Sequence, residues 1–237
     1  ELMRGVRVTS YGPARGRFME KAGVSWRHRF RSEPAKVSYC LPFTNDDATA
    51  LAREMNGNPW VEVRELGRTP VFDLPLRQFV VTDPTVPDAE KKGIWLYAGE
   101  DPWEFPGVHA LAGFLKFVAG DDPLAKTMRR KCIVSAIPHV NPDAVHRGDT
   151  NFSTDASGRD IVNTGLSWRR TDIPAHEMVK AALRKWKEDG RSVDLMATMH
   201  SSCFWNAVMR IDWAYDREVA RRFIDEVYAK KYVPWAA

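Results

Sequence analysis

The sequence predicts an α/β protein with a mixed, mostly parallel sheet flanked by helices, preceded by a small antiparallel β subdomain. Two observations indicate this fold class. From residue 44 onwards, apolar strand-like runs alternate with stretches of helical periodicity. Before residue 44, short segments with β-like alternation are separated by Gly and Pro. We therefore expect a β-rich subdomain over residues 1–43 and an α/β domain over residues 44–237.

The β subdomain is predicted from short segments at residues 6–8, 16–18, 24–30 and 36–41. Apolar and polar residues alternate most regularly over residues 24–30, a pattern typical of a half-buried antiparallel strand. Turn-forming Gly and Pro residues separate the segments, as hairpin connections require.

The α/β domain begins with a helix signal. The residues Thr44-Asn45-Asp46-Asp47 form an N-cap cluster before an apolar-periodic stretch that ends at Met55, and Asn56-Gly57 follows. Similar arguments give the remaining elements. Strands are expected at 61–66, 78–81, 93–98, 131–137 and, as a buried strand, 193–199; helices at 107–118, 174–189 and 216–230; and a long polar loop at 141–170.

Composition excludes several classes of protein. With 237 residues, 44% hydrophobic and 28% charged, the chain is neither disordered nor fibrous. No apolar run approaches the ~18 residues that span a membrane. Cys40, Cys132 and Cys203 are widely spaced and form no CxxC pair, which favours a reducing compartment such as the cytoplasm.

The net charge of +4 is concentrated at the amino terminus. Residues 1–32 hold eight basic residues against two acidic ones. Such a face is suited to nucleic acid or to an acidic polypeptide. A solvated, Arg-rich strand surface is the simpler interpretation, because no nucleic-acid recognition motif accompanies the charge.

Polar clusters follow three of the predicted strands, at residues 100–104, 138–143 and 200–203. In open α/β sheets the functional site lies outside the carboxyl ends of the strands. Asp101 and Glu104, three residues apart, could converge with His200 on one divalent metal ion. Carboxylate oxygens and neutral imidazole are accepted ligands of zinc, for which a catalytic site uses three protein ligands.

Four segments in this order resemble the zinc carboxypeptidase family, both its carboxypeptidase A-like and its cytosolic carboxypeptidase-like metallopeptidases. They are residues 63–69, 94–117, 137–148 and 193–201. The third contains the Asn141-Pro142-Asp143 motif and is the most specific. The resemblance covers roughly residues 40–205. It implies that residues 1–43 are part of a β-sandwich and that the α/β domain lacks the family's carboxyl-terminal part.

The resemblance also implies a zinc site and a peptide substrate. In the family, two His and one Glu hold zinc, which polarises the scissile carbonyl and activates a water molecule. Glu104 falls on the zinc-binding Glu and His200 on the second His, while Asp101 stands where the first His is expected. His139 is a further candidate ligand, although a structural role is the simpler interpretation. Asn151, Arg159 and Arg169 are candidates for binding the substrate carboxylate.

Several positions depart from the family's pattern. Asp101 adds an anionic ligand, which should weaken activation of water. Asn151 stands where an Arg is expected, and the Asp-x-Asn-Arg motif has no match, whether Val162-Asn163 or Gly165-Leu166 is placed there. Arg170 is an alternative to Arg159 and Arg169. No general-base Glu is found; two glutamates follow His200 on the last predicted helix and are interpreted as solvated charges, Glu218 and Glu226.

Two functions therefore remain open. The first is a zinc metallocarboxypeptidase that removes C-terminal residues from peptides or proteins. The second is a carboxypeptidase-fold protein without catalysis, or a truncated domain, that serves as a binding module. A third interpretation, nucleic-acid binding through the amino-terminal arginines, has only the charge in its favour and would show a steep salt dependence.

Overall fold

The structure is a computed structural model that describes residues 7–8, 24–25, 41–148, 152–162 and 167–200. The chain divides into two units, Glu1–Ser38 and Tyr39–Ala237. In the first unit, β1 (Arg7–Val8) pairs antiparallel with β2 (Val24–Ser25). The strand segment expected at 16–18 lies outside the described residues, as does the segment expected at 36–41 except for Leu41, which is not in a strand. The partial β-sandwich therefore stays a prediction.

The second unit is built on a five-stranded sheet in the order β3-β4-β6-β5-β9. Strand β4 is antiparallel to both of its neighbours, β3 and β6, whereas β5 is parallel to both β6 and β9. Four of the five strands therefore run in one direction, which confirms the mixed, mostly parallel sheet. The strands are β3 (Val61–Arg68), β4 (Pro75–Val81), β5 (Lys92–Ala98), β6 (Cys132–Ile137) and β9 (Leu195–Met199).

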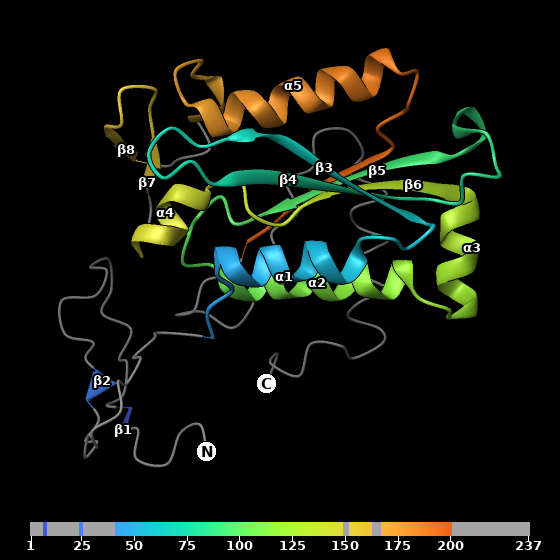
Figure 1. Cartoon of the computed structure of the whole chain (residues 1–237), viewed down its shortest axis with the longest axis horizontal. Coiled ribbons are helices and arrows are strands. Elements are labelled where there is room, and N and C mark those ends of the chain that lie inside the picture. Colours follow the sequence, from blue (N-terminus) through green and yellow to red (C-terminus); the bar gives the residue numbers. More distant parts are fainter. Residues whose placement is uncertain (1–6, 9–23, 26–40, 149–151, 163–166, 201–237) are drawn as a thin grey trace, which may run out of the picture. The chain divides into compact units, whose positions relative to one another are not determined.

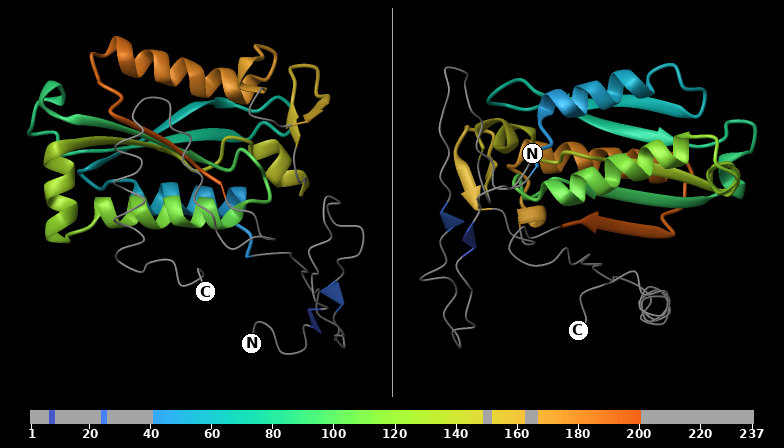
Figure 2. Two further views of the ribbon diagram at one scale, coloured as in Figure 1. Left: turned by 180° about the vertical axis from the view of Figure 1, so that it is seen from behind. Right: turned by 90° about the horizontal axis from the view of Figure 1, so that it is seen from below.

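Helices cover both faces of this sheet (Figures 1 and 2). Helices α1 (Asn45–Met55) and α2 (Phe105–Ala119) lie on one face, and α5 (Pro174–Glu188) lies on the other. Neighbouring residues of a strand point to opposite faces. In β5, Leu96 accordingly packs in the core beneath α1 and α2, and Trp95 packs in the core beneath α5.

Helix α1 begins where the sequence predicts. Thr44 is its N-cap, and its hydroxyl accepts a hydrogen bond from the Asp47 backbone while the Asp47 carboxylate accepts one from the Thr44 backbone. This capping box satisfies amide groups that the first turn leaves without partners. The predicted helices 107–118 and 174–189 are likewise confirmed within two residues at each end as α2 and α5.

The segment expected to be one long loop at 141–170 contains secondary structure, so that prediction was wrong. It includes α4 (Pro142–Arg147), the antiparallel pair β7 (Phe152–Thr154) and β8 (Asp160–Val162), and the 3-10 turn η2 (Ser167–Arg169). These elements are too short for a periodic pattern to develop. Helix α3 (Pro123–Lys131) was also missed, although Asp122 as N-cap and Pro123 at the first helical position mark its start.

Strand β9 is only partly buried, contrary to the prediction of a buried strand over 193–199. Within the part of the chain that the structure describes, β9 is an edge strand that pairs with β5 alone. Leu195 is 42% exposed and Met196 is 39% exposed, because no described strand lies on their other side. The helix expected at 216–230 lies outside the described residues.

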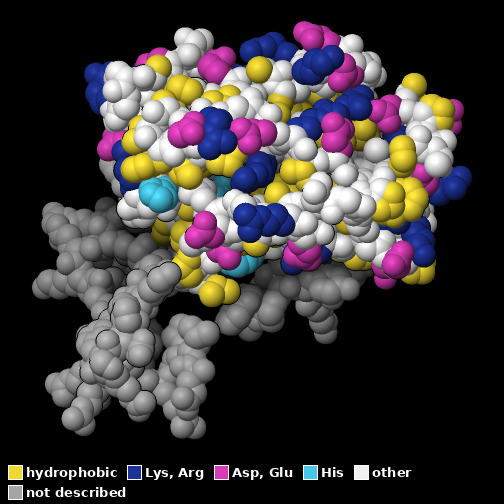
Figure 3. Space-filling model, viewed as in Figure 1, with side chains coloured by type: hydrophobic (Ala, Val, Ile, Leu, Met, Phe, Trp, Pro, Cys, Tyr) yellow, Lys and Arg dark blue, Asp and Glu magenta, His cyan; other side chains and the backbone are white. Residues whose placement is uncertain are grey.

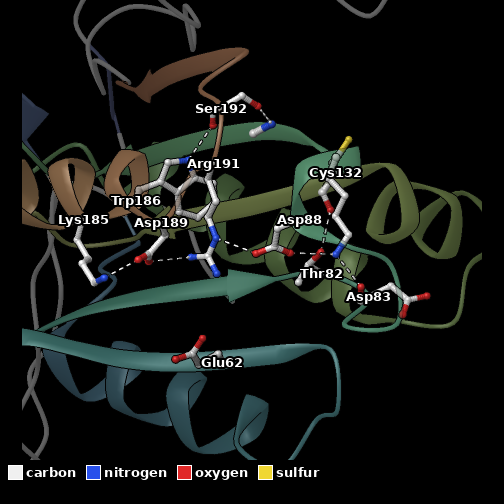
Figure 4. A network of polar contacts seen from close by, with 12 residues as sticks. Glu62, Thr82, Asp83, Asp88, Cys132, Lys185, Trp186, Asp189, Arg191 and Ser192 are labelled. Atoms are coloured by element: carbon white, nitrogen blue, oxygen red, sulfur yellow. Dashed lines mark hydrogen bonds and ion pairs between the residues drawn. The ribbon is translucent and has the colours of Figure 1, made fainter.

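A polar network fixes the turn that leads from α5 into β9 (Figure 4). The Arg191 guanidinium lies 5.0 Å from the ring centre of Trp186, and its Nε donates to Asp88 Oδ2 at 2.9 Å. Asp88 belongs to the 3-10 turn η1 (Asp88–Glu90) just before β5. The Trp186 indole N–H donates to the Ser192 carbonyl at 2.8 Å, and the Ser192 hydroxyl accepts from the Gly93 backbone at 3.1 Å. These contacts hold the beginning of β9 beside the beginning of β5.

The surface shows two further features. On the face seen in Figure 3, basic and acidic side chains are interspersed among the described residues. Across the described ranges, each helix is too short or too polar to cross a membrane. The basic cluster of residues 1–32 falls almost entirely outside the described residues, so its role stays a prediction.

Candidate metal centre

The candidate site is formed where β5 and β9 end together. In the parallel register of these strands, Ala98 lies opposite Met199. The residues that follow, 99–101 on one strand and His200 on the other, therefore emerge at the same edge of the sheet. Strand register alone brings residues about 100 positions apart in the sequence into one place.

Gly107 allows helix α2 to approach this edge closely. A Cβ atom at position 107 would lie 2.4 Å from the carbonyl oxygen of Met199, a distance that real side chains do not adopt. The first turn of α2 can therefore rest against the end of β9. Glu104, which immediately precedes α2, is placed against His200 as a result.

Asp101, Glu104 and His200 converge as the sequence predicts. His200 Nδ1 lies 2.9 Å from Glu104 Oε2 and 3.3 Å from Asp101 Oδ2. One ligand atom from each of the three residues lies within 4.8 Å of the others. Two carboxylates and one imidazole are a donor set that fits a divalent metal ion.

The surrounding carboxylates change the protonation of His200. Hydrogen bonds to Asp101, Glu100 and Glu104, in that order of size, raise the pKa of His200 to about 12, while burial opposes the shift. In the metal-free protein the ring is therefore an imidazolium at neutral pH. A metal ion that binds Nδ1 has to displace a proton, as is general for histidine ligands.

Glu100 is the site residue that sequence reasoning missed. Its side chain is buried, and its Oε1 accepts a hydrogen bond from the Trp168 indole N–H at 2.7 Å. Its Oε2 lies 3.5 Å from His200 Nε2. Glu100 belongs to the polar cluster noted at 100–104, but no sequence signal pairs it with a tryptophan 68 residues away.

His139 is placed in the core beside α1 and outside the group of three. Its ring packs edge-on against Phe43 at 5.4 Å, and its Nδ1 lies 3.4 Å from Asn45 Oδ1. Burial lowers the pKa of His139 to about 4, so the ring is neutral. Its Nε2 is buried and has no hydrogen-bond partner among the described residues. The geometry gives His139 the surroundings of a core histidine and does not bring it to the candidate ligands.

Two of the candidate substrate-binding arginines are paired with aspartates of this chain. Arg159 forms an ion pair with Asp155 at 3.1 Å, and Arg170 forms one with Asp172, its Nε lying 2.8 Å from Oδ1. Arg169 is exposed on η2. The remaining candidates lie outside the described residues: Asn151, residues 163–166, Glu218 and Glu226.

The Asn-Pro-Asp motif organises the loops around this edge. The buried Asp143 carboxylate accepts hydrogen bonds from the Thr69 hydroxyl at 2.5 Å and from the Val71 and Phe72 backbone at 3.2 Å. The Asn141 side-chain amide donates to the Ser153 hydroxyl at 3.3 Å. Both residues thus fix neighbouring loops, which is a structural role.

Sequence comparison relates the chain to carboxypeptidases. No family model matches it. It is 27% identical over 160 residues to cytosolic carboxypeptidase 6 of Caenorhabditis elegans, covering 63% of this chain and 32% of that protein. It is 23% identical over 183 residues to cytosolic carboxypeptidase 3 of Mus musculus, covering 75% of this chain and 18% of that protein. The chain thus spans a third or less of the length of these relatives.

Comparison of folds agrees with this relationship. The metallo-carboxypeptidase of Burkholderia cenocepacia superimposes with a TM-score of 0.59 over 70% of this chain and 43% of that chain, with 24% sequence identity. At this identity the likeness concerns the fold. The chain is therefore similar in sequence to cytosolic carboxypeptidases and similar in fold to metallo-carboxypeptidases.

Proposed function

We propose that this chain is a zinc metallocarboxypeptidase-like protein that hydrolyses C-terminal residues from peptides or proteins. The observation that carries the proposal is the convergence of Asp101, Glu104 and His200 at the edge of a carboxypeptidase-like sheet. The reaction class is supported by the relatives, which are named carboxypeptidases and metallo-carboxypeptidases.

In this proposal the three residues hold one zinc ion. When bound, zinc supplies Lewis-acid chemistry, polarising a carbonyl oxygen and lowering the pKa of water. His200 contributes Nδ1 after losing its proton, and Asp101 and Glu104 contribute carboxylate oxygens. Because two of the three ligands are anionic, the positive charge of the ion is more fully neutralised than it would be by two histidines. We therefore expect weaker activation of water than a two-histidine site would give.

The alternative is a binding module that recognises a peptide or protein C-terminus without cleaving it. Two observations favour it. Asp101 stands where the resemblance places a histidine ligand, and the arginines Arg159 and Arg170 are paired with aspartates of this chain. An arginine already bound to a carboxylate must give up that partner before it can bind a substrate carboxylate.

The first experiment is the zinc content of the protein purified without added metal or chelator. We expect about one equivalent per chain, and strongly reduced content in His200→Ala and in Glu104→Ala, because each removes a ligand. His146→Ala is the matched control, since His146 is exposed, packs on Phe72 and is not one of the three candidate ligands. Unchanged zinc in either ligand variant would contradict the site.

Peptide hydrolysis then separates the two functions. Zinc-loaded protein is incubated with peptides, and release of the C-terminal residue is followed by mass spectrometry. Release that depends on Glu104 supports the hydrolase. Zinc-loaded protein that binds peptides but releases no residue supports the binding module. Because the relatives are named cytosolic carboxypeptidases, we place either function in the cytosol.

A further inference from the structure

The two ring nitrogens of His200 face different carboxylates. Nδ1 faces Glu104 and Asp101, at 2.9 and 3.3 Å. Nε2 faces Glu100, at 3.5 Å. The group that can share one ion consists of Asp101, Glu104 and His200, so the Nδ1 side of the ring is the side of the candidate metal. Glu100 lies against the nitrogen that such an ion would leave unbound.

Glu100 is held in place by aromatic side chains. The Trp168 indole N–H donates to Oε1 of Glu100 at 2.7 Å. The Trp168 ring stacks on His176 of α5, with 4.2 Å between ring centres and 11° between planes, and Tyr97 packs against it edge-on at 5.4 Å. His176 is fully buried and Glu100 is 6% exposed. The carboxylate is therefore fixed from the side opposite His200.

We propose that Glu100 is a positioning residue that accepts the Nε2–H of His200 and so leaves Nδ1 to the metal. A metal-bound histidine commonly donates its other ring N–H to a carboxylate, which fixes its tautomer and orientation and raises the basicity of the ligating nitrogen. The inference rests on the metal site proposed above and assigns to it a chain of contacts from α5 through Trp168 and Glu100 to His200. Glu100 acts through His200 and is not itself one of the three ligands.

The Trp168 indole N–H and the His200 Nε2 face different oxygens of Glu100, an arrangement that suits a carboxylate. An ionised carboxylate accepts on both oxygens, so it serves the indole N–H on one side and the imidazole N–H on the other. A glutamine has the same shape but only one oxygen. With that oxygen toward Trp168, its amide N–H would face Nε2 and favour the tautomer that carries its proton on Nδ1, where the metal binds.

The test measures metal affinity in Glu100→Gln by competition between the purified protein and a chromogenic chelator for Zn²⁺ at constant pH. We expect an affinity roughly 10- to 100-fold below that of the wild type. Glu100→Asp, which restores two acceptor oxygens, should recover part of the loss. Trp168→Phe keeps an aromatic ring beside His176 but removes the indole N–H, and should give a smaller loss in the same direction.

Two further measurements distinguish positioning from a merely structural role. The ¹⁵N chemical shifts of the zinc-loaded wild type should report His200 as the Nε2-protonated tautomer, with His200→Ala providing the assignment. If Glu100→Gln fails to fold, Trp168→Phe carries the affinity test. A structural role alone would lower the unfolding temperature of the metal-free protein but leave the zinc affinity of the folded fraction at the wild-type value. That result would overturn the positioning role.

The outcomes also separate this inference from the proposed function. A wild-type protein that takes up no zinc overturns both. A wild-type protein that binds zinc, loses it in Glu104→Gln and keeps full affinity in Glu100→Gln overturns only the role of Glu100. Weaker binding in Glu100→Gln with partial recovery in Glu100→Asp supports both, whether or not the zinc-loaded protein hydrolyses peptides.

Discussion

His139 and His200 each follow a strand of the same sheet, β6 and β9, yet the protein gives them opposite properties. His139 is enclosed by Phe43 and the beginning of α1, and burial lowers its pKa to about 4. His200 contacts three carboxylates, which raise its pKa to about 12. A histidine at a strand end is therefore not a candidate ligand by position alone. The charged groups around it determine whether it can hold a cation.

A glycine supports each environment. Gly99 has a φ of +65°, and a Cβ there would lie 3.2 Å from the His139 Cα and 2.9 Å from the Pro138 carbonyl oxygen. Gly107 lets α2 reach the end of β9, where a Cβ would meet the Met199 carbonyl at 2.4 Å. Gly99 thus allows the chain to pass close to His139, and Gly107 allows α2 to bring Glu104 to His200.

The largest expected effect is the loss of folding stability that protonation of His139 causes at low pH. Its folded-state pKa lies below its unfolded value of 6.5, so its contribution to stability is complete above pH 6.5 and is lost as the pH falls toward 4. A shift of this size corresponds to about 3 kcal/mol. His139→Gln does not titrate, so urea unfolding should show a shallower loss of stability between pH 6.5 and 4 than in the wild type. Equal slopes would contradict a neutral, buried His139.

A smaller effect is expected from Gly107→Ala. The added methyl group has no room against Met199, so α2 has to shift, at a cost of about 2 kcal/mol of unfolding free energy. Zinc affinity should fall as well, because Glu104 moves away from His200. Gly113→Ala in the same helix is the control: nothing lies within 4 Å of its Cβ position, and alanine favours the helix. Equal effects of the two substitutions on thermal unfolding would rule out the close approach.

The smallest expected effect tests the donor set around His200. Asp101→His replaces a carboxylate with an imidazole and makes the surroundings of His200 less acidic. Imidazole suits Zn²⁺, whereas carboxylate suits Mn²⁺. The preference for Zn²⁺ over Mn²⁺, measured by competitive titration of both ions, should therefore rise about tenfold, or ~1.4 kcal/mol. Asp101→Asn keeps an oxygen ligand and should not show this rise. An unchanged preference in Asp101→His would mean that residue 101 does not contact the ion.

Much of the sheet and its covering helices could be predicted from the sequence, because the spacing of apolar residues in a long segment indicates whether it is a helix or a strand. The helices beginning near Asn45, Phe105 and Pro174 carry apolar residues at helical spacing, and β5 and β6 consist mostly of apolar residues. The small elements α3, α4, β7 and β8 escaped prediction. Their formation depends on caps and on contacts with distant segments, such as the bond from Thr69 to Asp143 of α4.

The site could be predicted only in part, for a related reason. Asp101, Glu104 and His200 are the polar residues that follow two strands, and the order of the strands brings them together. The contact between Glu100 and Trp168 arises from tertiary packing of η2 against β5, which no local pattern records. His139 is also a polar residue at a strand end. Its burial beside Phe43 distinguishes it from His200, and the sequence does not reveal that burial.

The register that sets Ala98 opposite Met199 has a consequence for how such a site can evolve. Backbone hydrogen bonds between β5 and β9 fix where residues 101 and 200 emerge, whatever side chains those positions carry. A single codon change at position 101 can therefore exchange one candidate ligand for another while the strands stay in place. The residues at the site and the sheet that carries them can thus change independently. The metal preference of the site can therefore change in evolution while the fold stays the same.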